Sequence, residues 1–196
     1  MKKAEIPAHV LKVSMEQAAR RGWADLSLLD IADASGVDLA DMHALFPTKS
    51  AILRGISARA DQAVLADGAT DRLGEPAKDR LFDVLMTRFE ALHPYRDGLA
   101  AVVRDSLRDP LAAGWNLMSL GASMQTMLEA AGFSTTGLRG AIRIKALGAV
   151  YLKAFRVWLN DDSEDLTKTM AVLDKSLSRL DSLAGRCRRD RETAKA

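Results

Sequence analysis

Two stretches decide the fold: LLDIADASGV at residues 28–37 and LFPTKSAIL at residues 45–53. Ser27 immediately precedes the first stretch, and Asp30 lies three residues after Ser27. This spacing is the pattern of a capping box at a helix start. Gly36 supplies the backbone freedom that a tight turn needs. The sequence therefore predicts two short helices joined in helix-turn-helix spacing.

Working outward from this motif, helical periodicity runs along almost the whole chain, and strand patterns are nearly absent. Proline and glycine residues mark the places where helices end. The pattern predicts an all-α fold of about nine helices, at residues 5–21, 27–35, 38–45, 49–66, 76–92, 96–108, 111–131, 136–159 and 163–184. The expected domains are a helix-turn-helix head at residues 1–60, a helical body at 61–185 and a basic tail at 186–196.

The composition excludes several classes of protein. The chain has 196 residues, 48% of them hydrophobic, with 28 basic and 26 acidic side chains, so it is neither disordered nor collagen-like. A single cysteine excludes an internal disulfide and a zinc site built on thiolates. The N-terminal residues show no secretory signal, which favours a cytoplasmic location. The longest uncharged stretch, residues 110–128, contains proline and glycine and reads as a buried helix rather than a membrane span.

No catalytic constellation is present in the sequence. The three histidines are widely separated, and neither a phosphate-binding glycine loop nor a nucleophile elbow occurs. We therefore expect neither an enzyme nor a metal site nor a cofactor.

The run from Ile31 through Leu53 resembles the N-terminal domain of the TetR family of transcriptional regulators. This resemblance implies a homodimer that places its third helix in the major groove of double-stranded DNA and binds an apolar or amphipathic ligand in its helical body. It also implies that Lys49 lies near a phosphate, and that His43 stands where the family usually has a phosphate-contacting tyrosine. The candidate DNA-binding residues are Ser27, Asp38, Asp41, Met42, His43 and Lys49.

The predicted reading helix, residues 38–45, has an unusual composition for DNA recognition. It lacks Lys, Arg, Asn, Gln, Ser and Thr, which read base edges. Asp38 and Asp41 have two interpretations. They can cap the helix start, or they can direct negative charge at the end that should meet DNA, which weakens binding.

The C-terminal half carries a second resemblance. Residues 143–151, 157–163 and 167–174, with the head residues 22–23 and 44–47, look like the lipid-binding accessory proteins of ubiquinone biosynthesis. That family shares the TetR fold, and the resemblance implies an isoprenoid-type lipid in place of DNA. The last helix and the arginines after it can lie on an anionic membrane surface, or form a dimer helix followed by a solvated tail.

Methionine and aromatic residues recur at helical spacings in the body, which suits either an apolar ligand pocket or an ordinary core. The candidate pocket residues are Phe82, Met86, Phe89, Trp115, Met118, Met124, Met127, Tyr151 and Trp158.

The last two predicted helices carry apolar residues at coiled-coil spacing, which indicates either a dimer interface or packing on their own core. The candidate interface residues are Ile144, Gly148, Leu152, Phe155, Leu166, Met170, Leu173, Leu177 and Leu180. The sequence thus leaves two functions open. The first is a ligand-responsive DNA-binding regulator, and the alternative is a lipid-binding protein of the same fold without DNA recognition.

Overall fold

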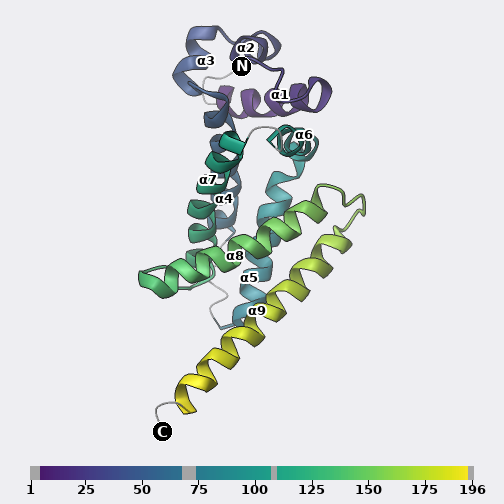
Figure 1. The fold of residues 1–196 in the computed structure, drawn as a ribbon. Coiled ribbons are helices and arrows are strands. Elements are labelled where there is room, and N and C mark those ends of the chain that lie inside the picture. The colour runs from purple at the N-terminus through teal and green to yellow at the C-terminus, as the bar shows by residue number, and fades with distance from the viewer. Residues whose placement is uncertain (1–4, 68–73, 107–109, 194–196) are drawn as a thin grey trace. The chain divides into compact units, whose positions relative to one another are not determined.

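The structure, a computed structural model, describes residues 5–67, 74–106 and 110–193, with the backbone alone for residues 110–119 and 184–193. Figure 1 shows helices joined by loops in this part of the chain, without a strand, so the predicted all-α fold is confirmed. In chain order the elements are α1 (Ile6–Arg21), α2 (Leu28–Ser35), α3 (Leu39–Leu45), α4 (Lys49–Ala66), α5 (Ala77–Leu92), the short 3₁₀ turn η2 (His93–Tyr95), α6 (Arg96–Ser106), α7 (Pro110–Ala130), α8 (Gly137–Trp158) and α9 (Thr167–Thr193).

The chain forms two compact units, each assembled from segments that are distant in the sequence. Unit 1 comprises residues 1–62 and 90–123, and unit 2 comprises residues 63–89 and 124–196. Residues 90–123, which the sequence analysis placed in the body, are therefore grouped with the helix-turn-helix head.

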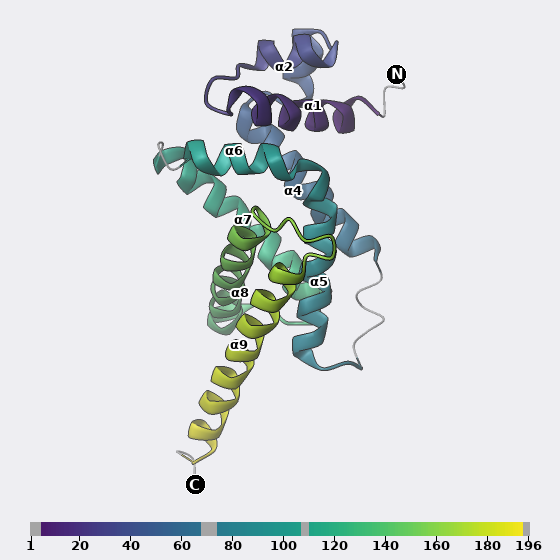
Figure 2. The ribbon, with the colours of Figure 1, turned by 90° about the vertical axis from the view of Figure 1, so that its right-hand side faces the viewer.

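In unit 1, α1 packs against α2, α6 and η2. Figure 2 shows α1 lying over α6. Gly98 makes this close approach possible, because a Cβ atom at that position would lie only 2.5 Å from both Cβ and the carbonyl oxygen of Met15. Met15 is 2% exposed, so the contact lies in the core of the unit.

The ends of α2 form as the sequence predicts. The Ser27 hydroxyl accepts from the Asp30 amide at 3.1 Å, and the Ser27 amide donates to the Asp30 carboxylate at 2.8 Å, which completes the capping box. Gly36 ends the helix with φ at +64°, the left-handed conformation that favours glycine. Asp38 occupies the N-cap position of α3, but its side chain makes no capping hydrogen bond there.

In unit 2, α8 packs against α9, and Figure 1 shows these helices converging at the turn that joins them. Helix α9 begins at Thr167 rather than at the predicted Ser163, and it continues past the predicted end to Thr193. Leu166, which precedes the helix, is buried and has a left-handed φ of 51°. The sequence pattern missed this irregular turn.

A buried carboxylate organises the turn between α8 and α9. Asp161 is fully buried, and it accepts hydrogen bonds from the amide and hydroxyl groups of both Ser163 and Thr169. Burial raises the pKa of Asp161, but these four hydrogen bonds outweigh that effect and lower the pKa to about 2. The ionised side chain therefore holds the first turn of α9 in place.

Candidate functional site

Helix α3 presents nearly all of its side chains to solvent. Met42 is fully buried beneath the helix, so it serves the core of unit 1. Asp38, Asp41 and His43 are exposed, as are two leucines, Leu39 (40%) and Leu45 (39%). The face of α3 is therefore acidic and apolar. Ser27, the remaining candidate on α2, uses its side chain in the capping box.

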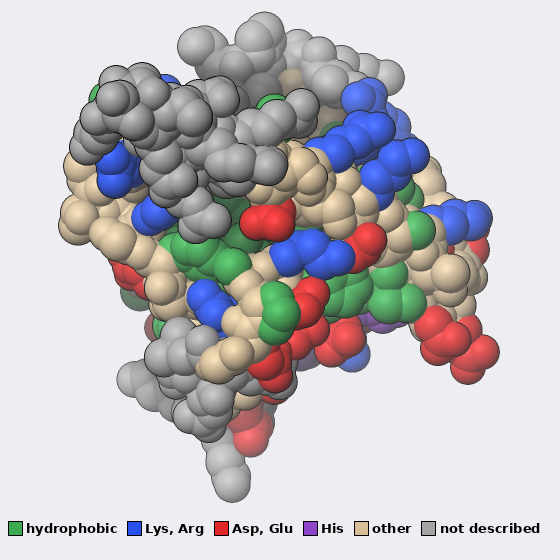
Figure 3. Space-filling model, turned by 90° about the horizontal axis from the view of Figure 1, so that it is seen from below, with side chains coloured by type: hydrophobic (Ala, Val, Ile, Leu, Met, Phe, Trp, Pro, Cys, Tyr) green, Lys and Arg blue, Asp and Glu red, His purple; other side chains and the backbone are tan. Residues whose placement is uncertain are grey.

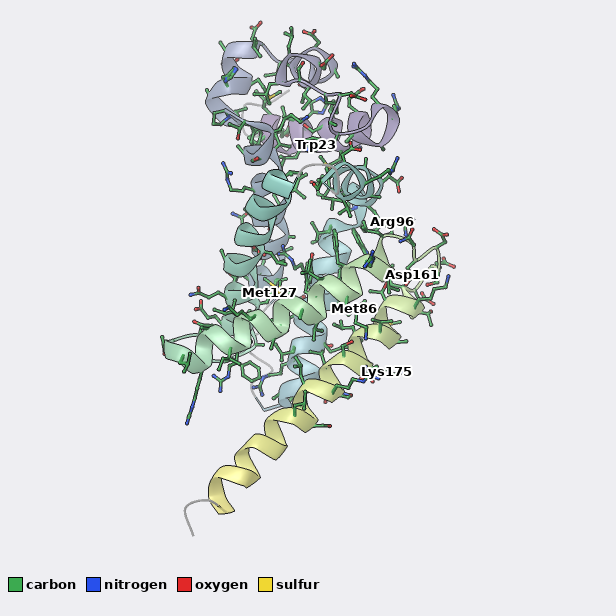
Figure 4. All side chains as sticks on the ribbon, viewed as in Figure 1. Trp23, Met86, Arg96, Met127, Asp161 and Lys175 are labelled. Atoms are coloured by element: carbon green, nitrogen blue, oxygen red, sulfur yellow. The ribbon has the colours of Figure 1, made fainter. Side chains whose placement is uncertain are left out.

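Lys49 lies at the start of α4 and points into the chain. Its ammonium donates to the carbonyl oxygens of Leu26 (2.7 Å), Ala24 (3.3 Å) and Trp23, and it lies 4.9 Å from the centroid of the Trp23 ring. Figure 4 marks Trp23 in this head region. Three carbonyl partners occupy the three donors of an ammonium group. In this conformation Lys49 closes the loop between α1 and α2.

Other cations near the head differ in how their charge is used. Arg21 pairs with Asp30 at 3.2 Å, and Lys12 lies 3.9 Å from Glu16. Arg20 and Arg54 are exposed. Backbone phosphates would therefore meet positive charge from α1 and α4 rather than from α3.

Most of the candidate pocket residues are buried inside unit 2. Phe89, Met124, Met127 and Trp158 are fully buried, and Met86 and Tyr151 are buried nearly as completely. Figure 4 marks Met86 on α5 and Met127 on α7. The Phe89 ring stacks on the Tyr151 ring with centroids 5.2 Å apart, and its centroid lies 5.6 Å from that of the Trp158 ring. The side chains of Trp115 and Met118 lie outside the described residues.

The hollow that the structure shows in unit 2 has a different lining. It encloses about 450 Å³ between the ends of four helices: the start of α5, the end of α7, the first half of α8 and the second half of α9. We call it the basic-rimmed groove. Its apolar lining includes Leu81, Leu128, Phe133, Ile142, Leu147 and Leu177, and its charged lining consists of Lys78, Arg139, Arg143 and Asp181. Figure 3, seen from below, shows apolar side chains open to solvent beside Lys and Arg side chains.

Sequence reasoning missed Arg139 and Arg143. These residues are one helical turn apart on α8, at the edge of its apolar stripe, and that spacing is the signal that could have identified them. Phe82, which the sequence analysis assigned to a pocket, lines a different recess, beside Met170 and Asp174.

The candidate dimer residues fall into three groups. Gly148, Leu166, Leu173 and Leu177 are buried within unit 2; Ile144, Phe155, Met170 and Leu180 are half-buried; and Leu152 is 43% exposed. The exposed apolar residues of α8 lie on a stripe that contains Leu138 (79%), Ile142 (59%) and Leu152 (43%). These apolar side chains are open to solvent, and the exposed Lys145 and Arg156 lie on the same side of α8.

Comparisons with known structures identify the architecture. A TetR transcriptional regulator from Nitrosomonas europaea superposes with a TM-score of 0.71 at 22% identity, over 88% of this chain and 96% of that one. The chain has the TetR fold. A TetR regulator from Rhodococcus sp. RHA1 superposes with a TM-score of 0.62 at 17% identity, covering 91% of this chain and 97% of that chain. For a TetR-family regulator from Streptomyces coelicolor the TM-score is 0.51 at 16% identity, with coverage of 90% and 84%.

These identities establish the TetR fold rather than a shared activity. No family model matches the sequence, and no curated protein matches it. Within the described residues, no group of three or more His, Cys, Asp or Glu side chains has an arrangement that would hold a metal ion. None of the described helices combines the length and the apolar character that crossing a membrane requires.

Proposed function

We propose that this TetR-fold protein is a ligand-responsive transcriptional regulator that binds double-stranded DNA as a homodimer. The observation that supports this function is the head itself. A capped α2, a left-handed Gly36 and a solvent-exposed α3 form a helix-turn-helix, the arrangement in which the second helix of the motif enters the major groove. In this role the candidate residues Asp41 and His43 face the groove, while exposed arginines on α1 and α4 meet phosphates.

The proposed response follows from two-fold symmetry. A dimer contacts two half-sites about one helical turn of DNA apart, so only one spacing of its two heads fits the site. A ligand that binds one spacing more tightly than the other shifts the population between them. We place the ligand in unit 2 and the dimer contact around the exposed candidate residue Leu152 of α8. The cytoplasm, where DNA is accessible, is the expected location.

The test is selection from fragmented genomic DNA of the source organism at physiological salt. The full-length protein would be used both as isolated and after removal of bound lipid, since a bound ligand can mask DNA binding. We expect enrichment of a palindromic site. Enrichment should be lost in a Leu152→Glu variant that no longer dimerises. Failure of both preparations to enrich any site would refute the proposal.

A second function, a lipid-binding protein of the same fold without DNA recognition, is favoured by the acidic face of α3 and by the inward Lys49. This function agrees with the resemblance to the accessory proteins of ubiquinone biosynthesis. It would also include a membrane contact of the C-terminal end. The side chains of the predicted basic tail, residues 186–196, lie outside the described residues. The same DNA selection separates the two functions, and mass spectrometry of lipids extracted from the preparation would identify the cargo of the second.

A further inference from the structure

The basic-rimmed groove combines two chemistries that an amphipathic ligand would need. Its floor is apolar, with Leu81 from α5, Leu147 from α8 and Leu177 from α9. Its volume of about 450 Å³ lies within the range of small-molecule sites, roughly 300–1,000 Å³. Leu147 and Leu177 are at most 2% exposed, so the floor is fixed by packing, while Ile142 at the rim is 59% exposed. A preformed apolar hollow therefore opens directly to solvent.

The charges on the groove are divided between its two sides. On the α5 side, Lys78 donates to the Asp174 carboxylate at 2.6 Å, and Asp181 faces it as well. These acids raise the pKa of Lys78, the hydrogen bond to Asp174 having the largest effect. The side of the groove formed by α5 and α9 therefore has its positive charge balanced by carboxylates.

On the α8 side, no carboxylate among the described residues pairs with the positive charge. Arg143 donates to the Ser134 carbonyl at 2.8 Å and lies 5.9 Å from the centroid of the Phe133 ring, and both partners are neutral. The side chain of Arg139 makes no hydrogen bond or ion pair within the described residues. The two arginines are one turn apart on α8, so both guanidinium groups line the same part of the groove.

We propose that this groove binds a single long-chain carboxylate, a fatty-acid-like anion, with its chain on the leucine floor and its carboxylate between Arg139 and Arg143. A guanidinium matches a carboxylate in shape and forms two parallel hydrogen bonds with it, which are stronger than hydrogen bonds between neutral groups. A neutral ligand would leave both guanidinium groups without a counter-charge. The inference names the ligand class of the proposed function and rests on it.

Calorimetric titration of the delipidated full-length protein tests the inference. Tetradecanoate and tetradecanol have the same chain length, and only the first carries a charge. We expect one tetradecanoate per chain and about tenfold weaker binding of tetradecanol, because a charged hydrogen-bonded contact is lost. Arg139→Gln should weaken tetradecanoate binding about tenfold and leave tetradecanol unchanged. Arg156→Gln is the matched control, since Arg156 is exposed on α8 but does not line the groove.

A second variant tests the location. Ala146 lines the groove, and Ala146→Phe should block the binding of both ligands while circular dichroism shows native helix content. Equal affinity for the two ligands, or unchanged binding in Arg139→Gln, would overturn the inference. A third result would also overturn it: the native protein binds neither ligand, and Ala146→Phe loses the dimer. A second copy of the chain would then occupy the groove.

DNA binding is scored separately, so the two proposals fail in different ways. Tetradecanoate binding without operator enrichment refutes the regulator and leaves the groove assignment intact. Operator enrichment without tetradecanoate binding refutes the groove assignment alone.

Discussion

The ammonium of Lys49 lies 4.9 Å from the centroid of the Trp23 ring and donates to the carbonyl oxygens of the loop that follows Trp23. Burial lowers the pKa of Lys49, and the nearby carboxylates of Asp105, Asp25 and Asp30 oppose that shift. The TetR resemblance assigns this lysine to a phosphate contact. Its geometry here indicates that it first stabilises the head.

We predict that Lys49→Met lowers the free energy of unfolding by about 2–3 kcal/mol, because the loop carbonyls lose a charged donor. Urea denaturation of the purified protein would measure the loss. Arg54→Met, an exposed change one turn later on α4, is the control and should have little effect. Unchanged stability in Lys49→Met, together with weaker salt-dependent DNA binding, would mean that the lysine turns outward to a phosphate.

The two glycines Gly98 and Gly121 should respond in opposite directions to substitution by alanine. A Cβ on Gly98 meets Met15 at 2.5 Å, including its backbone, so Gly98→Ala should cost about 1–3 kcal/mol through overpacking. A Cβ on Gly121 meets no described atom within 4 Å, so Gly121→Ala should stabilise α7 by about 0.5–1 kcal/mol. Thermal unfolding of both variants measures whether each substitution lowers or raises the stability. A stable Gly98→Ala protein would show that α1 and α6 are packed less closely than described.

The buried Asp161 predicts a pH dependence of stability. Its folded pKa of about 2 is below the ordinary value of 3.8, so the folded state favours the ionised form. The ionised Asp161 therefore contributes on the order of 2 kcal/mol to the free energy of unfolding. This contribution is complete above pH 3.8 and is lost as the pH falls towards 2. Asp161→Asn should therefore destabilise the protein at pH 7, and the difference from the native protein should shrink between pH 4 and pH 2.

The measurement for Asp161 is the urea midpoint at several pH values. Glu164→Gln is the control, because Glu164 is exposed in the same turn and carries the same charge. A constant difference between Asp161→Asn and the native protein at all pH values would contradict the pKa assignment.

Local sequence signals predicted the helix-turn-helix because its determinants lie within a few residues of each other. Ser27 and Asp30 form the predicted capping box, and Gly36 adopts the predicted left-handed turn. The predicted start of α9 was wrong because the buried carboxylate of Asp161 binds both Ser163 and Thr169 and holds the residues between them in a turn. A composition pattern reads Asp161 as an exposed turn residue.

The site was less predictable than the fold, for a physical reason. Periodicity selects the apolar face of a helix, but it does not distinguish a packed core from a hollow. Phe89 and Trp158 were predicted as pocket residues, and in the structure their ring centroids lie 5.6 Å apart in the core of unit 2. Likewise, the residue type of Lys49 does not reveal whether its ammonium faces solvent or the chain's own carbonyls.

A substitution of the exposed Asp41 tests whether the acidic face of α3 repels DNA or reads a base. A carboxylate near DNA repels phosphates, unless it accepts a hydrogen bond from a cytosine amino group. We predict that Asp41→Asn raises affinity for DNA of any sequence, because it removes one negative charge from the face that the proposed function places in the groove. Fluorescence anisotropy with operator and scrambled duplexes, at two salt concentrations, measures this. Asp165→Asn removes the same charge from unit 2 and should change neither affinity. If Asp41→Asn instead weakens operator binding and leaves the scrambled duplex unchanged, Asp41 reads a base.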